Sequence, residues 1–153
     1  MAKKICCVLG YRDIPAERLE AVGMALRREI LQAIEEGYTF FISGFGQGVD
    51  LLFAALVVEQ KRQKPHLFLE AALPYAGRAK TKDELFHALL GQCNGIRIVC
   101  SDYAPGCFIR RNQYMVLRAQ RVIAVYDGRK NGAVLRTLHY AQEQGREVRV
   151  INA

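Results

Sequence analysis

The sequence predicts a single three-layer α/β domain, in which a mainly parallel sheet carries helices on both of its faces. Three features predict this class. Short apolar runs typical of buried strands alternate with longer segments whose apolar residues recur every three or four positions. Glycines stand at many of the junctions between these segments. The segments follow one another without a linker or a repeat, so residues 1–153 are expected to form one domain.

The first half of the chain is predicted to contain two strand–helix units. Residues 4–10 are a short apolar run that ends at a glycine, typical of a buried strand. The next helix is expected to begin near Pro15, which suits a first helical turn, and to end at Gly37. Its apolar residues recur at spacings of three and four: Leu19, Val22, Leu26, Ile30 and Ile34. Residues 39–43 are rich in β-branched and aromatic side chains and predict a second strand. Residues 49–60 are apolar nearly all round, which is typical of a helix packed deep against a sheet.

The second half of the chain continues this alternation. Strands are predicted over residues 67–73, 96–100, 121–126 and 148–151. Helices are predicted over residues 81–90, 108–120 and 133–144, the last of which ends at Gly145. Strands that alternate with helices form parallel sheets covered on both faces. A ligand is therefore expected beyond the carboxyl ends of the strands, near the point where the strand order reverses.

The composition argues against several classes of protein. With 51% hydrophobic and 24% charged residues, the chain has the composition of an ordinary soluble domain. No apolar run reaches the roughly 18 residues that a membrane span needs, so no membrane partner is expected. The apolar run after the first lysines is short and lacks a cleavage site, which favours a first strand over a signal peptide and predicts a cytoplasmic protein. Five cysteines without C-x-x-C spacing and three scattered histidines predict a reduced chain with no metal site and no cofactor.

The positive charge of the chain is concentrated in its last third. The formal net charge is +7, and residues 107–153 carry nine Lys or Arg against three Asp or Glu. An anionic partner is therefore expected there. Aromatic residues are not interleaved with the basic ones, so the charge by itself gives weak support for nucleic acid.

A glycine-rich loop follows the second predicted strand. Gly44, Gly46 and Gly48 come directly after Ser43 with a G-x-G-x-G spacing, which matches neither the dinucleotide fingerprint nor the P-loop. Glycines let a backbone approach an anion, and the next helix directs its free N–H groups toward that anion. The loop is therefore predicted to bind a phosphate-bearing ligand, with a plain tight turn as the alternative. Asp50 is either a helix cap favoured by the helix dipole or an acceptor for a sugar hydroxyl.

Two later segments are also candidates for ligand contacts. Arg110 and Arg111 stand at a helix start, where cations oppose the helix dipole, so a bound anion would explain the pair. The alternative is a solvated basic face. Asn112 can both donate and accept, which suits a ribose or a base edge. The polar loop from Asp127 to Gly132 is either an ordinary turn or part of the site.

Together these motifs resemble the SLOG superfamily. The resemblance rests on Gly10 and Arg12, Ser43-Gly44 with Gly48-Val49-Asp50, Phe108 with Arg111-Asn112, and Tyr126-Asp127-Gly128 with Asn131-Gly132 and Thr137. It keeps this order over almost the whole chain and is strongest with the YpsA-like branch of bacteria and phages. The superfamily also contains the Lonely Guy phosphoribohydrolases and DNA-processing protein A.

The resemblance implies a Rossmann-like fold that binds a nucleotide or a nucleotide-derived ligand, such as an ADP-ribose derivative, as a sensor or regulatory module. The ligand-binding residues expected at the strand ends are Gly10, Arg12, Ser43, Gly44, Gly46, Gly48, Asp50, Arg110, Arg111, Asn112, Asp127, Gly132 and Thr137.

The chain departs from the Lonely Guy motif P-G-G-x-G-T-x-x-E. The motif threonine falls on Val134, and the catalytic glutamate falls on Thr137, which cannot act as a carboxylate. Whether the protein is an enzyme is left open, and no catalytic residue is assigned. The first alternative is a nucleotide N-glycosidase or phosphoribohydrolase that uses Asp50 or Asp127. The second alternative is single-stranded nucleic-acid binding by the basic last third, and a homodimer is also left open.

Overall fold

A computed structural model describes residues 3–153 as one α/β domain built on a single six-stranded sheet. Met1 and Ala2, the first residues of the expected domain, lie outside the described residues. The strands are β1 (Lys4–Leu9), β2 (Tyr38–Ser43), β3 (Phe68–Tyr75), β4 (Gly95–Cys100), β5 (Arg121–Tyr126) and β6 (Glu147–Asn152). The helices are α1 (Ala16–Glu35), α2 (Val49–Gln63), α3 (Glu84–Leu90), α4 (Cys107–Arg118) and α5 (Ala133–Glu143), together with a short 3₁₀ helix, η1 (Ala76–Lys80).

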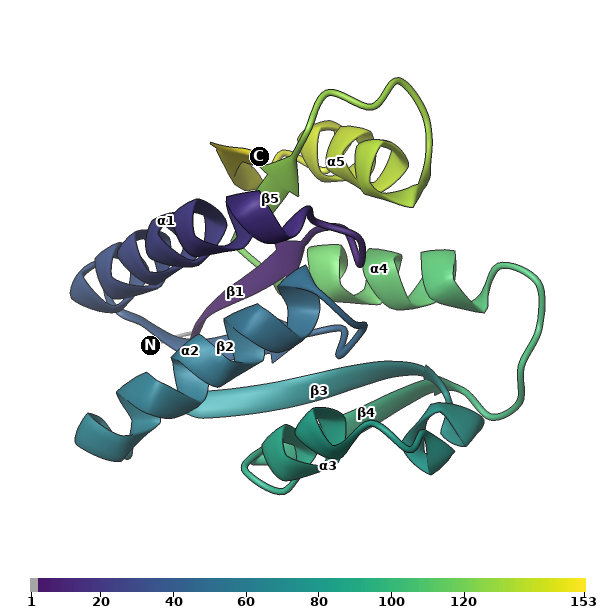
Figure 1. Cartoon of the computed structure of the whole chain (residues 1–153), viewed down its shortest axis with the longest axis horizontal. Coiled ribbons are helices and arrows are strands. Elements are labelled where there is room, and N and C mark those ends of the chain that lie inside the picture. Colours follow the sequence, from purple (N-terminus) through teal and green to yellow (C-terminus); the bar gives the residue numbers. More distant parts are fainter. Residues whose placement is uncertain (1–2) are drawn as a thin grey trace.

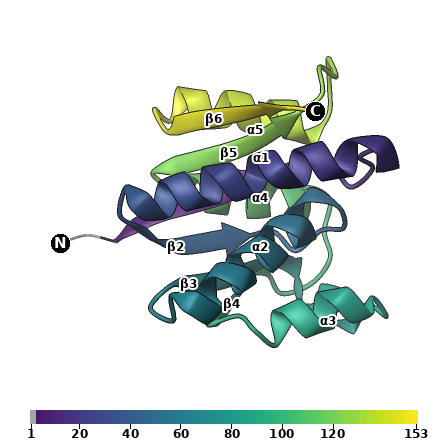
Figure 2. The ribbon, with the colours of Figure 1, turned by 60° about the vertical axis from the view of Figure 1, so that its left-hand side comes forward.

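The sheet lies between two layers of helices. Figures 1 and 2 show α1, α2 and α3 on one face and α4 and α5 on the other. All five strand pairings are parallel. This arrangement confirms the predicted three-layer α/β class, and it makes the sheet wholly rather than mainly parallel. No helix within residues 3–153 is long and apolar enough to cross a bilayer.

The strand order is β4-β3-β2-β1-β5-β6. The chain adds strands on one side of β1 as far as β4 and then crosses over to place β5 on the other side. The order therefore reverses between β1 and β5. In open parallel sheets a crevice forms at the carboxyl ends of two such strands.

Adjacent residues of β1 supply both hydrophobic cores, because side chains alternate across a strand. Cys6 and Val8 pack with α1 and α2, whereas Cys7 and Leu9 pack with α4 and α5. Both thiols are fully buried, and all five cysteines are free. Burial raises the pKa of Cys6 and of Cys7 well above the ordinary thiol value. These two cysteines therefore act as small hydrophobic residues.

The segment after β3 differs most from the sequence-based expectation. The strand continues to Tyr75, η1 follows it, and α3 begins at Glu84 rather than at residue 81. Asp83 sets this start, because its carboxylate accepts the N–H groups of Leu85 at 3.0 Å and Phe86 at 3.3 Å. The longer strand and the 3₁₀ turn bring Tyr75 and Arg78 to the carboxyl edge of the sheet.

Candidate functional site

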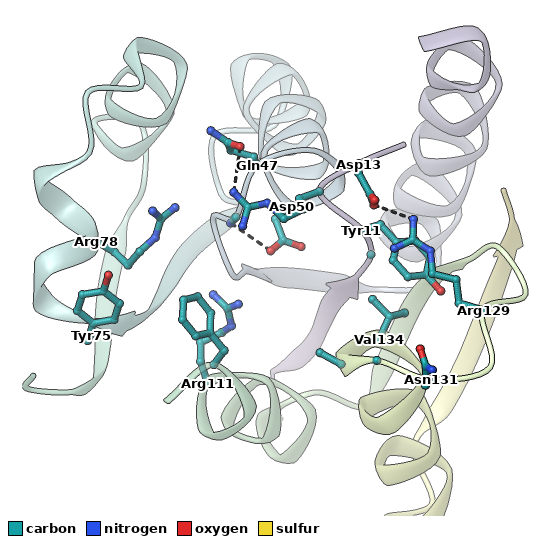
Figure 3. Close-up of a pocket in the computed structure, with 16 residues that line it drawn as sticks. Tyr11, Asp13, Gln47, Asp50, Tyr75, Arg78, Arg111, Arg129, Asn131 and Val134 are labelled. Atoms are coloured by element: carbon teal, nitrogen blue, oxygen red, sulfur yellow. Dashed lines mark hydrogen bonds and ion pairs between the residues drawn. The ribbon is translucent and has the colours of Figure 1, made fainter. Parts of the chain in front are cut away.

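A cavity of about 470 Å³ opens at the carboxyl edge of the sheet (Figure 3). It lies beside the switch point between β1 and β5. Its wall is formed by the β1–α1 loop, the glycine loop before α2, the end of β3 with η1, the start of α4 and the β5–α5 loop. Its volume is in the range of small-molecule sites. Of the predicted ligand-binding residues, those that line it are Gly10, Arg12, Gly46, Asp50, Arg111 and Gly132.

Arg111 lies at the floor of the cavity and is almost completely buried. Only 7% of the residue is exposed, although it lines the cavity. Its Nη1 donates to the carbonyls of Gly44 and, at 3.3 Å, Ala72, and its Nε donates to Asn112 Oδ1 at 2.8 Å. Burial lowers the pKa of Arg111, and the nearby charge of Asp50 opposes this shift. Arg110 is exposed and does not line the cavity, so Arg111 is the member of the pair that faces the cavity.

Arg129 forms the opposite wall and is fixed by two carboxylates. Its Nε donates to Asp127 at 2.8 Å and its Nη2 donates to Asp13 at 2.7 Å, while its guanidinium lies 4.0 Å above the ring of Tyr11. Partial desolvation acts to raise the pKa of Asp127, but the hydrogen bonds from Arg129 outweigh it and the pKa lies below its ordinary value. Asp127 therefore orients Arg129 and does not itself line the cavity.

Asp50 enters the cavity from the first turn of α2. Its Oδ2 accepts the Gly46 N–H at 3.1 Å, and its backbone carbonyl accepts the Ser43 hydroxyl at 2.8 Å. Burial raises the pKa of Asp50 to about 6, and the charge of Arg111 and the Gly46 N–H only partly oppose this rise. Asp50 is thus a carboxyl with a raised pKa in a cavity that four arginines and one further carboxylate, Asp13, also line.

The glycines of the loop fit groups of the protein itself. A Cβ atom on Gly44 would lie 2.7 Å from Arg111 Nη1 and 3.0 Å from Asp50 Oδ2, and a Cβ atom on Gly46 would also lie 3.0 Å from that oxygen. Gly48 has φ +81°, and its Cβ would meet the Tyr11 carbonyl at 2.5 Å. The loop must therefore be glycine-rich even without a ligand, and the predicted approach to a phosphate stays a prediction.

Four of the predicted residues lie behind the cavity wall. Asn112 donates to the Thr137 hydroxyl at 3.2 Å, which joins α4 to α5, and Thr137 is only 3% exposed. Ser43 and Gly44 are also buried. In this structure these residues support Asp50 and Arg111 rather than the cavity surface, and direct ligand contacts by them stay predictions.

Several residues that line the cavity were not among those predicted from the sequence. Tyr75 and Phe108 form an aromatic side, with ring centroids 6.3 Å apart, and Tyr75 also contacts Tyr103 at 5.4 Å. Arg78 and Arg129 add two cations. Tyr75 and Arg129 could have been found, because both follow predicted strands, whereas Arg78 lies in a 3₁₀ turn that no pattern indicated. Within residues 3–153 no cluster of three His, Cys, Asp or Glu side chains could hold a metal ion.

The fold and the cavity define a Rossmann-like α/β domain with an arginine-rich cavity beside its topological switch point. Residues 6–152 match the model of the YspA SLOG family (YpsA). The chain belongs to this family, which confirms the resemblance to the SLOG superfamily and its YpsA-like branch.

The chain is also similar in sequence to proteins of two Bacillus species, over most of the length of each. The chain is 27% identical over 157 residues to a UPF0398 protein of Bacillus thuringiensis (strain Al Hakam), in an alignment that covers 93% of this chain and 84% of the relative. It is 26% identical over the same length to a UPF0398 protein of Bacillus cereus (strain B4264), with the same coverage.

Two solved structures have a similar fold. DNA processing protein A from Helicobacter pylori, whose structure was described for its single-stranded DNA binding mode, superposes with a TM-score of 0.70 at 16% identity over 98% of this chain. The match covers 66% of that longer chain, just under two thirds of it. The protein TM1055 superposes with a TM-score of 0.62 at 17% identity, over 95% of this chain and 72% of its own. At these identities the likeness shows a shared fold.

Proposed function

We propose that this protein binds a nucleotide or a nucleotide-derived ligand in the cavity at the strand ends, as a sensor or regulatory module. The observation that carries the proposal is the convergence of arginines from four separate segments on a cavity with an aromatic side. These arginines are Arg12, Arg78, Arg111 and Arg129. Such a combination matches a ligand that has both anionic groups and a flat ring.

The β5–α5 side of the cavity suits a phosphate. Helix α5 begins after Gly132, no side chain caps its N-terminus, and Ala133 and Val134 line the cavity. The free N–H groups of such a helix end attract anions. Arg12 adds positive charge from the β1–α1 loop, and Arg129, in the β5–α5 loop itself, presents a guanidinium that Asp13 and Asp127 hold in place. On the other side, Tyr75 and Phe108 offer ring faces and edges to a base.

Thermal shift and titration calorimetry with nucleotides, ADP-ribose derivatives and dinucleotides test this function. At a ligand concentration about 100 times the dissociation constant, binding should stabilise the folded protein by about 2.7 kcal/mol. If no phosphate- or ribose-containing compound raises the melting temperature at millimolar concentration, the proposal is wrong.

A matched pair of variants localises the binding. Arg12 and Arg110 are both exposed, but only Arg12 lines the cavity. We expect Arg12→Ala to weaken binding about tenfold, which corresponds to about 1.4 kcal/mol, and Arg110→Ala to change it less than twofold. Equal effects of the two substitutions would place the ligand elsewhere.

The N-glycosidase alternative has one observation in its favour, which is Asp50. A carboxyl with a pKa of about 6 inside the cavity suits general acid–base work. Thr137 does not provide this chemistry, because it is buried and bonded to Asn112. The assay is release of free base from a panel of nucleotides. Turnover that Asp50→Asn reduces by about 10²-fold or more would establish this alternative.

Single-stranded nucleic acid remains the second alternative. The fold resembles that of DNA processing protein A. Tyr103, which is 64% exposed and contacts Tyr75, extends the aromatic side of the cavity to the surface. Bases stack on such exposed rings in single-strand binders.

A further inference from the structure

Asp50 and Arg111 carry opposite charges at the floor of the cavity without a hydrogen bond between them. Asp50 Oδ2 accepts from the Gly46 N–H, while Arg111 donates to the uncharged oxygens of Gly44, Ala72 and Asn112. Within residues 3–153 no hydrogen bond engages Asp50 Oδ1 or Arg111 Nη2. Each charged group therefore keeps capacity for a further partner.

The position of the missing Gly44 side chain shows how close these two groups are. A Cβ atom there would touch both Arg111 Nη1, at 2.7 Å, and Asp50 Oδ2, at 3.0 Å. The two charges thus lie within a few ångströms of each other, a separation at which each one shifts the titration of the other. Asp50 serves as the nearby counter-charge of a buried guanidinium.

The other ionisable groups around Asp50 come from every neighbouring segment. Arg12 from the β1–α1 loop and Arg78 from η1 line the same cavity, and Arg78 also acts on the charge of Arg111. The Cys7 thiol on β1 is uncharged, because burial raises its pKa and the charge of Asp50 adds to this rise. On the far wall, Arg129 is shared by two carboxylates, Asp13 at 2.7 Å and Asp127 at 2.8 Å. Asp50 is the carboxylate in this set that has no ion-pair partner within residues 3–153.

We propose that Asp50 takes up a proton from solvent when an anionic group binds at Arg111. This inference rests on the proposed function, since it describes how the same cavity accommodates an anion. The anion replaces Asp50 as the counter-charge of the guanidinium, and its negative charge disfavours an ionised carboxylate beside it. The proton goes to Oδ1, so Oδ2 keeps its hydrogen bond from Gly46. The protonated carboxyl can then donate to the anion.

Linkage between proton binding and anion binding predicts how the affinity for an anion changes with pH. If anion binding favours protonated Asp50, lower pH strengthens anion binding by the same coupling. The pKa of about 6 in the free protein leaves Asp50 mostly ionised at pH 7, so there is a proton to gain. The site selects ligands by charge, because an uncharged nucleoside brings no anion and should cause no proton uptake.

A carbon-detected NMR titration of the Asp50 carboxyl in ¹³C-aspartate-labelled protein tests the coupling directly. Sulfate is the probe, because it does not titrate near pH 6. We expect saturating sulfate to raise the titration midpoint of Asp50 by at least about one pH unit, which is a tenfold change in proton affinity. An unchanged midpoint would overturn the proposal, as would the absence of any sulfate effect on the Arg111 side-chain resonances.

Calorimetry with ADP-ribose, in two buffers of different ionisation enthalpy, then counts the protons. ADP-ribose is suitable because its diphosphate bridge does not titrate near pH 6, whereas a phosphate monoester does. We expect uptake of about 0.4 to 0.9 proton per ligand at pH 7 and an affinity that falls up to about tenfold per pH unit between pH 6 and 8. Binding without proton uptake contradicts this inference and leaves the proposed function standing. A rise in the Asp50 midpoint with sulfate, without binding of any nucleotide, supports this inference and contradicts the proposed function.

Two variants assign the proton to Asp50. In Asp50→Asn the side-chain oxygen still accepts from Gly46, so we expect folded protein with no proton uptake, a flat pH profile and about tenfold tighter ADP-ribose binding at pH 8. Asp13→Asn removes the other carboxylate that lines the cavity and should leave proton uptake in place. If Asp50→Asn instead weakens binding at every pH, Asp50 accepts a ligand hydroxyl as an anion and the proposal is wrong.

Discussion

Asp50 illustrates how a single buried carboxylate changes the stability of the folded chain with pH. Its pKa is about 6 in the native protein, whereas an aspartate in an unfolded chain titrates near 3.9. Between these values the native state binds more protons than the unfolded state. Stability contributed by this group therefore falls as pH rises from about 4 to 6, and it stays lower above pH 6.

Asp50→Asn should consequently stabilise the protein at neutral pH. We expect the free energy of unfolding to rise by about 2–3 kcal/mol at pH 7–8, because the buried negative charge is removed, and the gain to disappear near pH 4. Urea denaturation at pH 4, 6 and 8 measures this difference. A variant that is less stable than the native protein at pH 8 would contradict the assigned cause.

Asp127 provides a control with the opposite sign. Its pKa is lowered, because the hydrogen bonds from Arg129 outweigh partial desolvation. Such a group contributes stability above its unfolded pKa, and this stability is lost as pH falls through the lower native value. Asp127→Asn should therefore destabilise the protein at pH 7 and have a smaller effect in acid.

At the scale of elements, the loop between β2 and α2 depends on glycine at a defined position. Gly44→Ala would place a methyl group 2.7 Å from the Arg111 guanidinium, so we expect a loss of about 1–3 kcal/mol in unfolding free energy together with weaker ligand binding. Gly23→Ala is the matched control. Gly23 lies inside α1, where the nearest atom to a new Cβ is 3.9 Å away in Leu52, so alanine should stabilise by about 0.5–1 kcal/mol. Equal effects in thermal denaturation would disprove this account of the loop.

The order of the elements could be predicted from the sequence because it depends on local patterns. The fifth strand, Arg121–Tyr126, has the predicted bounds, and the glycine loop lies where the pattern placed it. The contacts inside the site could not be predicted in this way. Arg111 bonds to Gly44 across 67 positions, and only the packing of α4 on the sheet turns Arg111 inward and Arg110 outward. The sequence indicated the pair of arginines but not which one faces the cavity.

On the scale of the whole molecule, the folded chain redistributes its charge. The sequence places most of the excess positive charge after residue 107, which suggested an anionic partner there. Two of the cavity arginines, Arg12 and Arg78, nevertheless come from the nearly neutral first part of the chain. The cavity is therefore assembled from both parts, and its charge is a property of the fold.

Salt dependence separates a cavity ligand from a nucleic-acid strand. A nucleotide bound by one or two phosphates should lose affinity only gradually with salt, whereas a single strand loses about 0.7 log units per contacted phosphate for each tenfold rise in salt. For an oligodeoxynucleotide, we expect a plot of log affinity against log salt concentration to have a slope shallower than about −2. We also expect the oligodeoxynucleotide to compete with a mononucleotide. A slope steeper than about −4 that Arg110→Ala or Lys130→Ala reduces would favour the nucleic-acid alternative.

The rate at which the adjacent thiols of Cys6 and Cys7 are alkylated reports how often the sheet opens. Both lie fully buried on β1, between β2 and β5, with pKa values raised by burial. An alkylating reagent can reach them only when the central strand separates from its neighbours, whereas half-buried Cys100, on the edge strand β4, should react earlier. Because β1 leads directly into Gly10 in the cavity wall, a ligand that binds only the closed protein should slow the reaction of these thiols. The rate at which they are modified therefore reports occupancy of the cavity without any label on the ligand.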